Sequence, residues 1–142
     1  MRSRPARLTR ASIAGGVYFA AVFAAGFVLG TVRVLVLEPA IGALGAVLIE
    51  APVILTWSWL VCRALIARMT PAPKVGERAL MGAFAFTCLI AAELLLSLTV
   101  FGGAARDVVE GWITPAGALG LAGQIAFALF PLVMPRGDSA AS

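Results

Sequence analysis

The sequence predicts an all-α membrane protein, a polytopic bundle of four transmembrane helices formed by a single domain over residues 1–142. Three observations support this fold class. Hydrophobic residues make up 61% of the chain and charged residues 13%, whereas a soluble domain carries about 25% charged residues. The mean hydropathy is +1.01. The charged residues also leave four apolar runs, each long enough for the about 20 residues that cross the hydrocarbon core of a bilayer.

We expect the four helices at about 11–37, 40–66, 79–102 and 111–134. The first run is free of charge up to Arg33, the second is interrupted by Glu50 and the third by Glu93, while the fourth has no charged residue. The first run is longer than the about 7–15 apolar residues of a secretory signal peptide. No A-x-A cleavage motif follows it, so we expect an uncleaved first helix.

The basic residues predict the orientation of the helices. Nine of the eleven fall on one side of the predicted membrane: Arg2, Arg4, Arg7, Arg10, Arg63, Arg68, Lys74, Arg78 and Arg136. Arg106, with Arg33 near the far end of the first helix, lies toward the other side. Because cytoplasmic loops are enriched in Lys and Arg, we expect both termini in the cytoplasm. The composition, rich in Arg, Ala and Gly, is typical of a GC-rich bacterial genome, so we expect a multi-pass protein of the bacterial inner (plasma) membrane.

A candidate polar centre lies within these apolar runs. A charged side chain within a bilayer costs from about 2.5–3.5 kcal/mol on insertion scales to about 10–17 kcal/mol in simulations, so it requires a partner, a water-filled cavity or a function. The short connection around Pro39 makes the first two helices antiparallel neighbours. Counted from that turn, Arg33 and Glu50 differ in depth by roughly 6 Å, a gap that an Arg side chain spans. We therefore predict an Arg33–Glu50 ion pair.

Glu93 and Gln124, near the middle of the third and fourth helices, are expected to join this pair in one layer. Two carboxyls that share a low-dielectric site with one guanidinium should not both stay ionised, so one of them is expected to hold a proton. A proton relay or a cation site requires such a group. The same arrangement also fits a structural network in which the charges fix only helix packing, and the sequence leaves both interpretations open.

Small residues and one proline are expected to shape the helix contacts. Small side chains let helix backbones approach closely in a membrane, and a GxxxG strip on the first helix leads to Arg33. The expected packing residues are Gly26, Gly30, Gly42, Ala46, Gly117 and Gly120. Pro52 cannot donate a hydrogen bond to the Leu48 carbonyl, so we expect it to kink the second helix one turn from Glu50.

The composition argues against several kinds of site. The chain has no histidine, the usual general base and a common haem and metal ligand. Cys62 and Cys88 lie far apart in apolar segments, without a CxxC motif. We therefore predict no catalytic residue, no metal and no cofactor. The expected partners are the lipid bilayer and either further copies of the chain or another membrane-complex subunit. The basic loops also fit a lipid-phosphate or nucleic-acid surface, but membrane topology demands the same charges, so no nucleic acid is expected.

The run Gly26-Phe-Val-Leu-Gly-Thr-Val-Arg33, followed by Glu38-Pro39, Glu50-Ala-Pro52 and Ser58-Trp59, resembles uncharacterised small four-helix membrane proteins of proteobacteria. The resemblance covers most of the chain, implies the four-helix fold and carries no activity. The size and helix number are also similar to membrane enzymes of the MAPEG type. Those enzymes rely on Arg, Asn and Glu in the second helix, whereas this chain contains no asparagine.

The sequence favours a role other than catalysis. The leading hypothesis is a small permease or channel-like bundle, or a subunit of a membrane complex, with Arg33, Glu50 and Glu93 as its polar centre. The alternative is a structural or assembly partner whose buried charges only fix helix packing. A MAPEG-like enzyme comes third, because no Ser, Thr or Tyr lies near a base in a recognisable spacing. A bundle this small has little room for a pathway, so transport would favour an oligomer.

Overall fold

The computed structural model describes residues 3–100 and 102–135, and all regular structure within them is helical. In chain order the elements are α1 (Arg4–Val32), η1 (Arg33–Leu37), α2 (Glu38–Arg68), α3 (Val75–Thr99), α4 (Ala105–Gly111) and α5 (Pro115–Val133). The described residues contain no strand, which confirms the predicted all-α class. Arg2 and Arg136, two of the basic residues that predict the orientation, lie outside the described part of the chain.

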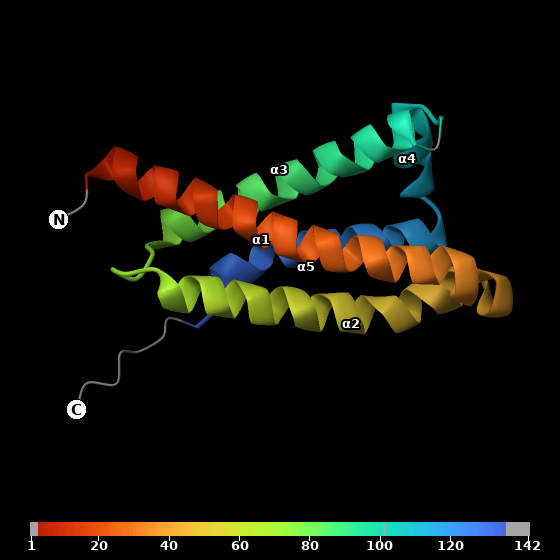
Figure 1. The fold of residues 1–142 in the computed structure, drawn as a ribbon, viewed down its shortest axis with the longest axis horizontal. Helices are drawn as coiled ribbons and strands as arrows, with labels where there is room; N and C mark the ends of the chain where they lie inside the picture. Colours follow the sequence, from red (N-terminus) through yellow and green to blue (C-terminus); the bar gives the residue numbers. More distant parts are fainter. Residues whose placement is uncertain (1–2, 101, 136–142) are drawn as a thin grey trace.

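Three continuous helical stretches are long and apolar enough to cross a membrane: Arg4–Arg68, Val75–Thr99 and Pro115–Val133. The first, with 65 residues, would reach about 98 Å if it were straight. Instead it folds back, so that α1 and α2 lie side by side in opposite directions (Figure 1). The structure therefore has four long helices, α1, α2, α3 and α5, whose length and composition suggest a location in a membrane.

The reversal between α1 and α2 depends on a π-helical turn and one glycine. In η1 the backbone N–H of Glu38 donates to the carbonyl of Arg33, five residues earlier, which is the spacing of a π-helix. Gly42 then leaves helical geometry, with a φ of 79° and a ψ of 164°. Glycine adopts a positive φ without the steric cost that other residues incur. Gly42 thus serves the turn, and the helix contact predicted for it is not made, because a Cβ at this position would face open space.

Pro52 lies inside α2, which continues through it as a helix. The carbonyl of Pro52 accepts a hydrogen bond from the Thr56 hydroxyl at 2.7 Å. The backbone angles of α2 depart from helical values at Gly42, where a positive φ redirects the chain.

Prolines explain where α1 and α5 begin. α1 starts at Arg4, before the predicted residue 11, because Pro5 occupies the first turn, where a missing N–H costs no helical hydrogen bond. α5 lies within the predicted fourth helix, 111–134, and begins four residues later, at Pro115, while the short α4 precedes that helix. Thr114 is the N-cap of α5, and its hydroxyl oxygen accepts from the backbone N–H of Gly117 at 3.0 Å. This cap and Pro115 set the start of α5.

The hydrophobic core lies at one end of the bundle, where α1 and α3 begin and α2 and α5 end. Its buried side chains come from the four long helices and the residues just after them: Ala14, Tyr18, Val22, Cys62, Ile66, Met69, Met81, Ala85, Phe127 and Met134. The rings of Tyr18 and Phe127 stack with their centroids 4.3 Å apart, and the Tyr18 hydroxyl donates to the Phe127 carbonyl at 2.9 Å. We call this the core end of the bundle.

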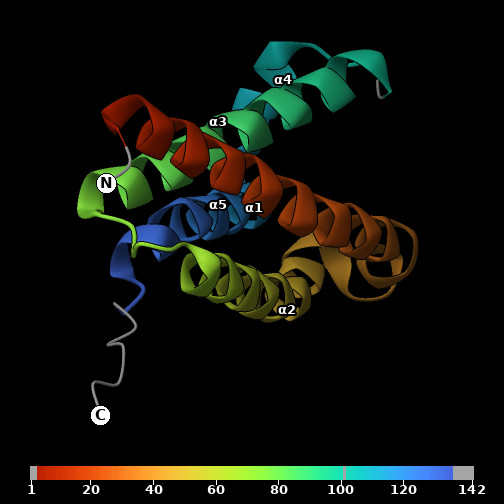
Figure 2. The same ribbon diagram turned by 60° about the vertical axis from the view of Figure 1, so that its left-hand side comes forward.

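At the opposite end, which we call the open end, the helices separate. There η1 joins α1 to α2, α3 leads into α4, and both views show α3 and α4 diverging from the α1–α2 hairpin (Figures 1 and 2). Large apolar side chains remain exposed, including Leu35 at 71%, Leu95 at 61% and Ile113 at 83%. Apolar surface of this extent marks contact with lipid or with another protein.

Two glycines allow helices to approach closely near the core end. A Cβ on Gly15 of α1 would lie 2.7 Å from the Met81 carbonyl oxygen of α3. A Cβ on Gly82 of α3 would lie 2.1 Å from the Ala128 carbonyl oxygen of α5. Real side chains do not tolerate such distances, so these two positions fix how α3 packs between α1 and α5.

The glycines predicted as packing residues do not make interhelical contacts as close as those of Gly15 and Gly82. Ala46 is fully buried. A Cβ on Gly26 would make an ordinary contact with α2 at 3.8 Å, and one on Gly30 or Gly120 would meet nothing within 4 Å. Gly117 is close to the end of α4, one turn before its own helix, and not to another long helix. The predicted GxxxG strip of α1 therefore does not bring two backbones together in this structure.

Candidate functional site

The first polar group of the structure joins Arg33 to Glu38 and Glu50 near the open end, and we call these three residues the hairpin cluster. Arg33 Nε lies 2.6 Å from Glu50 Oε2, and Arg33 Nη1 donates to Glu38 Oε1. The side chains of Arg33, Glu38 and Glu50 are 28%, 29% and 16% exposed. One guanidinium faces two carboxylates, so the cluster has a surplus negative charge when all three groups are ionised.

The local backbone explains why Arg33 has two partners. A π-helical turn brings residues five positions apart onto one face, whereas a regular helix pairs residues three or four apart. The reversal through Gly42 then returns α2 along α1, which places Glu50 opposite Arg33. The predicted Arg33–Glu50 ion pair is present. Glu38 was not predicted as a member, because a regular helix would have turned it away from Arg33.

The second polar group is a contact between α3 and α5. Gln124 Nε2 donates a hydrogen bond to Glu93 Oε1. The other polar atom of this amide, Oε1, is buried without a hydrogen-bond partner among the described residues. An amide side chain is a common interhelical hydrogen-bond donor in membrane proteins. Glu93 thus has a neutral partner from the neighbouring helix, and the described residues give it no cationic one.

The predicted polar residues belong to two hydrogen-bonded groups. Among the described residues, no hydrogen bond or ion pair connects Glu93 or Gln124 to the hairpin cluster. The carboxyl that shares Arg33 with Glu50 is that of Glu38, not that of Glu93.

A second charged cluster lies at the core end, and we call Arg7, Arg10 and Glu77 the terminal cluster. Glu77, near the start of α3, has Oε1 at 2.6 Å from Arg7 Nε and Oε2 at 2.9 Å from Arg10 Nη2. The Glu77 side chain is only 6% exposed. Two guanidinium groups face one carboxylate, which leaves a surplus positive charge. Arg10 Nε and Nη1 are buried without a hydrogen-bond partner among the described residues.

Arg78 connects the start of α3 to the end of α5. Its Nε donates to the Pro131 carbonyl and its Nη2 to the Met134 carbonyl, and the residue is 4% exposed. The last carbonyls of a helix have no N–H partner within it and carry partial negative charge, so a guanidinium group satisfies them well. Glu77 and Arg78, adjacent in sequence, therefore fasten α3 to α1 on one side and to α5 on the other.

This role of the core end is not predicted from the sequence, where Arg7, Arg10 and Arg78 indicate only membrane topology and Glu77 has no assigned role. The available signal was that Glu77 stands among basic residues at the predicted start of a transmembrane helix. A carboxylate that stays unpaired at the membrane boundary is costly. Arginines from the neighbouring helix are therefore favourable partners for Glu77.

The described residues contain no group of three or more His, Cys, Asp or Glu side chains that would hold a metal ion. Cys62 is buried, Cys88 is half-buried, and neither forms a disulfide. Comparison of the chain with protein-family models, with curated proteins and with solved structures gives no match.

Proposed function

We propose that the chain is a multi-pass protein of a bacterial inner membrane that works as a subunit of a membrane assembly, in which further copies of the chain cover the open end. The observation that carries this proposal is the hairpin cluster. Its three charged side chains are 16% to 29% exposed, and Leu35 and Leu48, each two positions from a member in sequence, are exposed apolar residues. Lipid does not solvate charges, so a second protein surface is the favourable neighbour.

The depth of the carboxyl groups supports this reading. The rise along α2 from Arg63 back to Glu50 is about 20 Å, and that along α3 from Arg78 to Glu93 is about 22 Å. Both values are smaller than the about 30 Å thickness of the hydrocarbon core. On this proposal Glu50 and Glu93 lie at similar depths within the hydrocarbon core, where exposure of a carboxylate to lipid is costly.

Cross-linking in native membranes tests the assembly. In a Cys88→Ala background, Leu35→Cys places a thiol at the open end, and Ile13→Cys places one at the core end with similar exposure, 63% against 71%. A bifunctional maleimide should link Leu35→Cys chains into dimers or larger species and leave Ile13→Cys chains largely monomeric. Equal cross-linking at both positions, or a monomeric mass for the wild type in mild detergent, would overturn the proposal.

The proposed orientation has both termini in the cytoplasm. It is supported by the basic residues at the core end, of which Arg63, Arg68 and Lys74 are exposed. A reporter fused after Ser142 should read as cytoplasmic, whereas one inserted at Gly103 should read as external. Two reporters on the same side would contradict the four-span topology.

Ion or solute passage is the second candidate function, and the surplus carboxylate of the hairpin cluster favours it. Two carboxylates against one guanidinium attract a cation or retain a proton, and Glu93 with Gln124 supplies a further polar group. Purified protein in liposomes should then carry a proton or alkali-cation flux that Glu50→Gln and Glu93→Gln reduce, while Glu110→Gln, an exposed residue outside the clusters, does not. If intact oligomers carry no flux, the result favours the alternative in which the charged residues only fix helix packing.

A further inference from the structure

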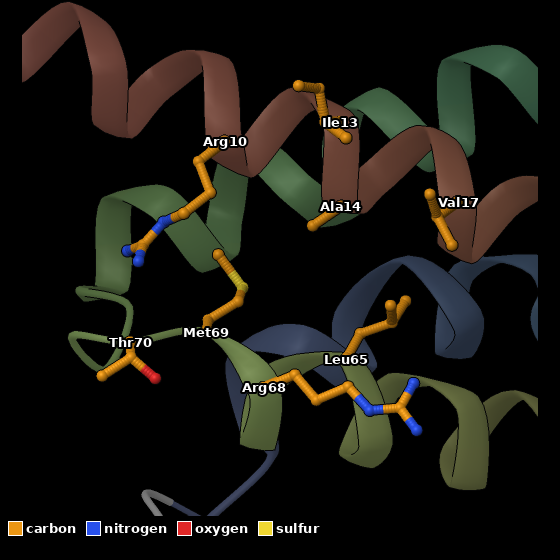
Figure 3. A pocket seen from close by; sticks show the side chains of 8 residues that line it. All are labelled: Arg10, Ile13, Ala14, Val17, Leu65, Arg68, Met69 and Thr70. Atoms are coloured by element: carbon orange, nitrogen blue, oxygen red, sulfur yellow. The ribbon is translucent and has the colours of Figure 1, made fainter.

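The core end has a groove that shares one residue, Arg10, with the terminal cluster. It lies between α1 and the end of α2, and its volume is about 380 Å³. Ile13, Ala14 and Val17 line it from α1, and Leu65 lines it from α2. Figure 3 shows Ala14 on α1 and Leu65 on α2 pointing toward one another across the groove, with Ile13 and Val17 further along α1. Its walls therefore suit an aliphatic ligand.

Basic and polar side chains complete this groove. Arg10 and Arg68 both line it, together with Met69 and Thr70 from the segment that follows α2. In Figure 3, Arg10 reaches from α1 toward Thr70, while Arg68 extends along α2 on the other wall. The groove thus combines an apolar interior with guanidinium groups from both helices.

The charges of the groove are not neutralised within the described residues. Glu77 binds one edge of Arg10, but Arg10 Nε and Nη1 are buried without a partner. Arg68 is exposed, and no described carboxylate lies within ion-pair distance of it. Arg10 thus adds positive charge beside the groove, while the exposed guanidinium of Arg68 is accessible to an acceptor, and a phosphate oxygen is a strong one for guanidinium.

We propose that this groove binds one anionic phospholipid of the leaflet on the core-end side, with its phosphate held by Arg68, near the positive charge of Arg10, and its acyl chains along Ile13, Val17 and Leu65. The inference rests on the proposed membrane insertion and not on the proposed assembly. The exposed Thr70 hydroxyl offers a further donor to the headgroup. Basic residues at a membrane surface attract anionic lipid, and an adjoining apolar channel adds selectivity for a ligand with chains.

Native mass spectrometry of the full chain in mild detergent tests this proposal. Dioctanoyl phosphatidylglycerol is titrated against dioctanoyl phosphatidylcholine, which has the same chains without net charge, and against glycerol 3-phosphate, which lacks chains. We expect a single saturable phosphatidylglycerol adduct and weaker binding of the other two. Arg68→Gln should weaken that adduct about fivefold, the factor that corresponds to one basic residue at a membrane surface. Arg63→Gln, an exposed arginine of the same helix outside the groove, should leave it unchanged.

Three results would overturn the inference. Equal binding of both lipids would show that only acyl chains are recognised, and equal binding of glycerol 3-phosphate would show a site for soluble phosphate. Equal losses of phosphatidylglycerol binding in Arg68→Gln and Arg63→Gln would show that the lipid responds to general surface charge and not to the groove. The same spectra report the oligomeric state of the chain. A monomer with a specific lipid adduct would refute the proposed assembly but not the lipid site. An oligomer without a lipid adduct would refute the lipid site but not the assembly.

Discussion

The terminal cluster offers the sharpest test of what stabilises the bundle, through Glu77→Gln. Removing one partner of a buried ion pair typically costs about 3–5 kcal/mol, because the other charge is left unpaired. Glu77 is 6% exposed, whereas Arg7 and Arg10 keep 19% and 16% exposure and regain some hydration near the chain end. The glutamine amide also retains one hydrogen-bond acceptor. We therefore expect a loss of about 2–3 kcal/mol in the free energy of unfolding.

Glu110→Gln is the matched control for this substitution. Glu110 also pairs with an arginine, Arg106, at 2.5 Å, but the two side chains are 52% and 83% exposed. Exposed pairs of this kind contribute about 0.3–0.5 kcal/mol. Unfolding of both variants in dodecyl maltoside, titrated with sodium dodecyl sulfate and followed by tryptophan fluorescence, gives the comparison. If Glu77→Gln is no less stable than Glu110→Gln, the burial of the terminal cluster does not determine stability.

Two further predictions use the same assay. Gly82→Ala should destabilise the fold by about 1–3 kcal/mol, because its Cβ would overlap the facing α5 carbonyl. Gly30→Ala, which faces open space, should be neutral or stabilise the fold by about 0.5–1 kcal/mol. Equal effects of the two substitutions would refute the close α3–α5 contact. In the hairpin cluster, Arg33→Ala should destabilise more than Glu50→Ala, because Glu38 still neutralises Arg33 in the second variant while the first leaves two carboxylates unpaired. The opposite order would mean that Glu38 does not pair with Arg33.

The sequence predicts the helices and one ion pair well, because both depend on spacing alone. Apolar runs define the four long helices, and a short turn forces Arg33 and Glu50 to face each other. The role of Glu38 depends on a π-helical turn, which no periodicity in the sequence reveals. The position of Glu93 depends on how far α3 diverges from the hairpin, and that is decided by contacts such as those of Gly15 and Gly82. The sequence does not distinguish a glycine that packs against another backbone, such as Gly82, from one that faces open space, such as Gly30.

The pairing of Tyr18 with Phe127 has a consequence for biogenesis. The hydroxyl and its acceptor are 109 positions apart in the chain, and the Ala128 carbonyl that faces Gly82 also belongs to α5. Until the ribosome has synthesised α5, the earlier helices lack the ring and the carbonyls that complete their packing. Formation of the first helices and closure of the core are therefore separate events, and a nascent chain halted before α5 would be helical yet loosely packed, with apolar surface exposed to aggregation.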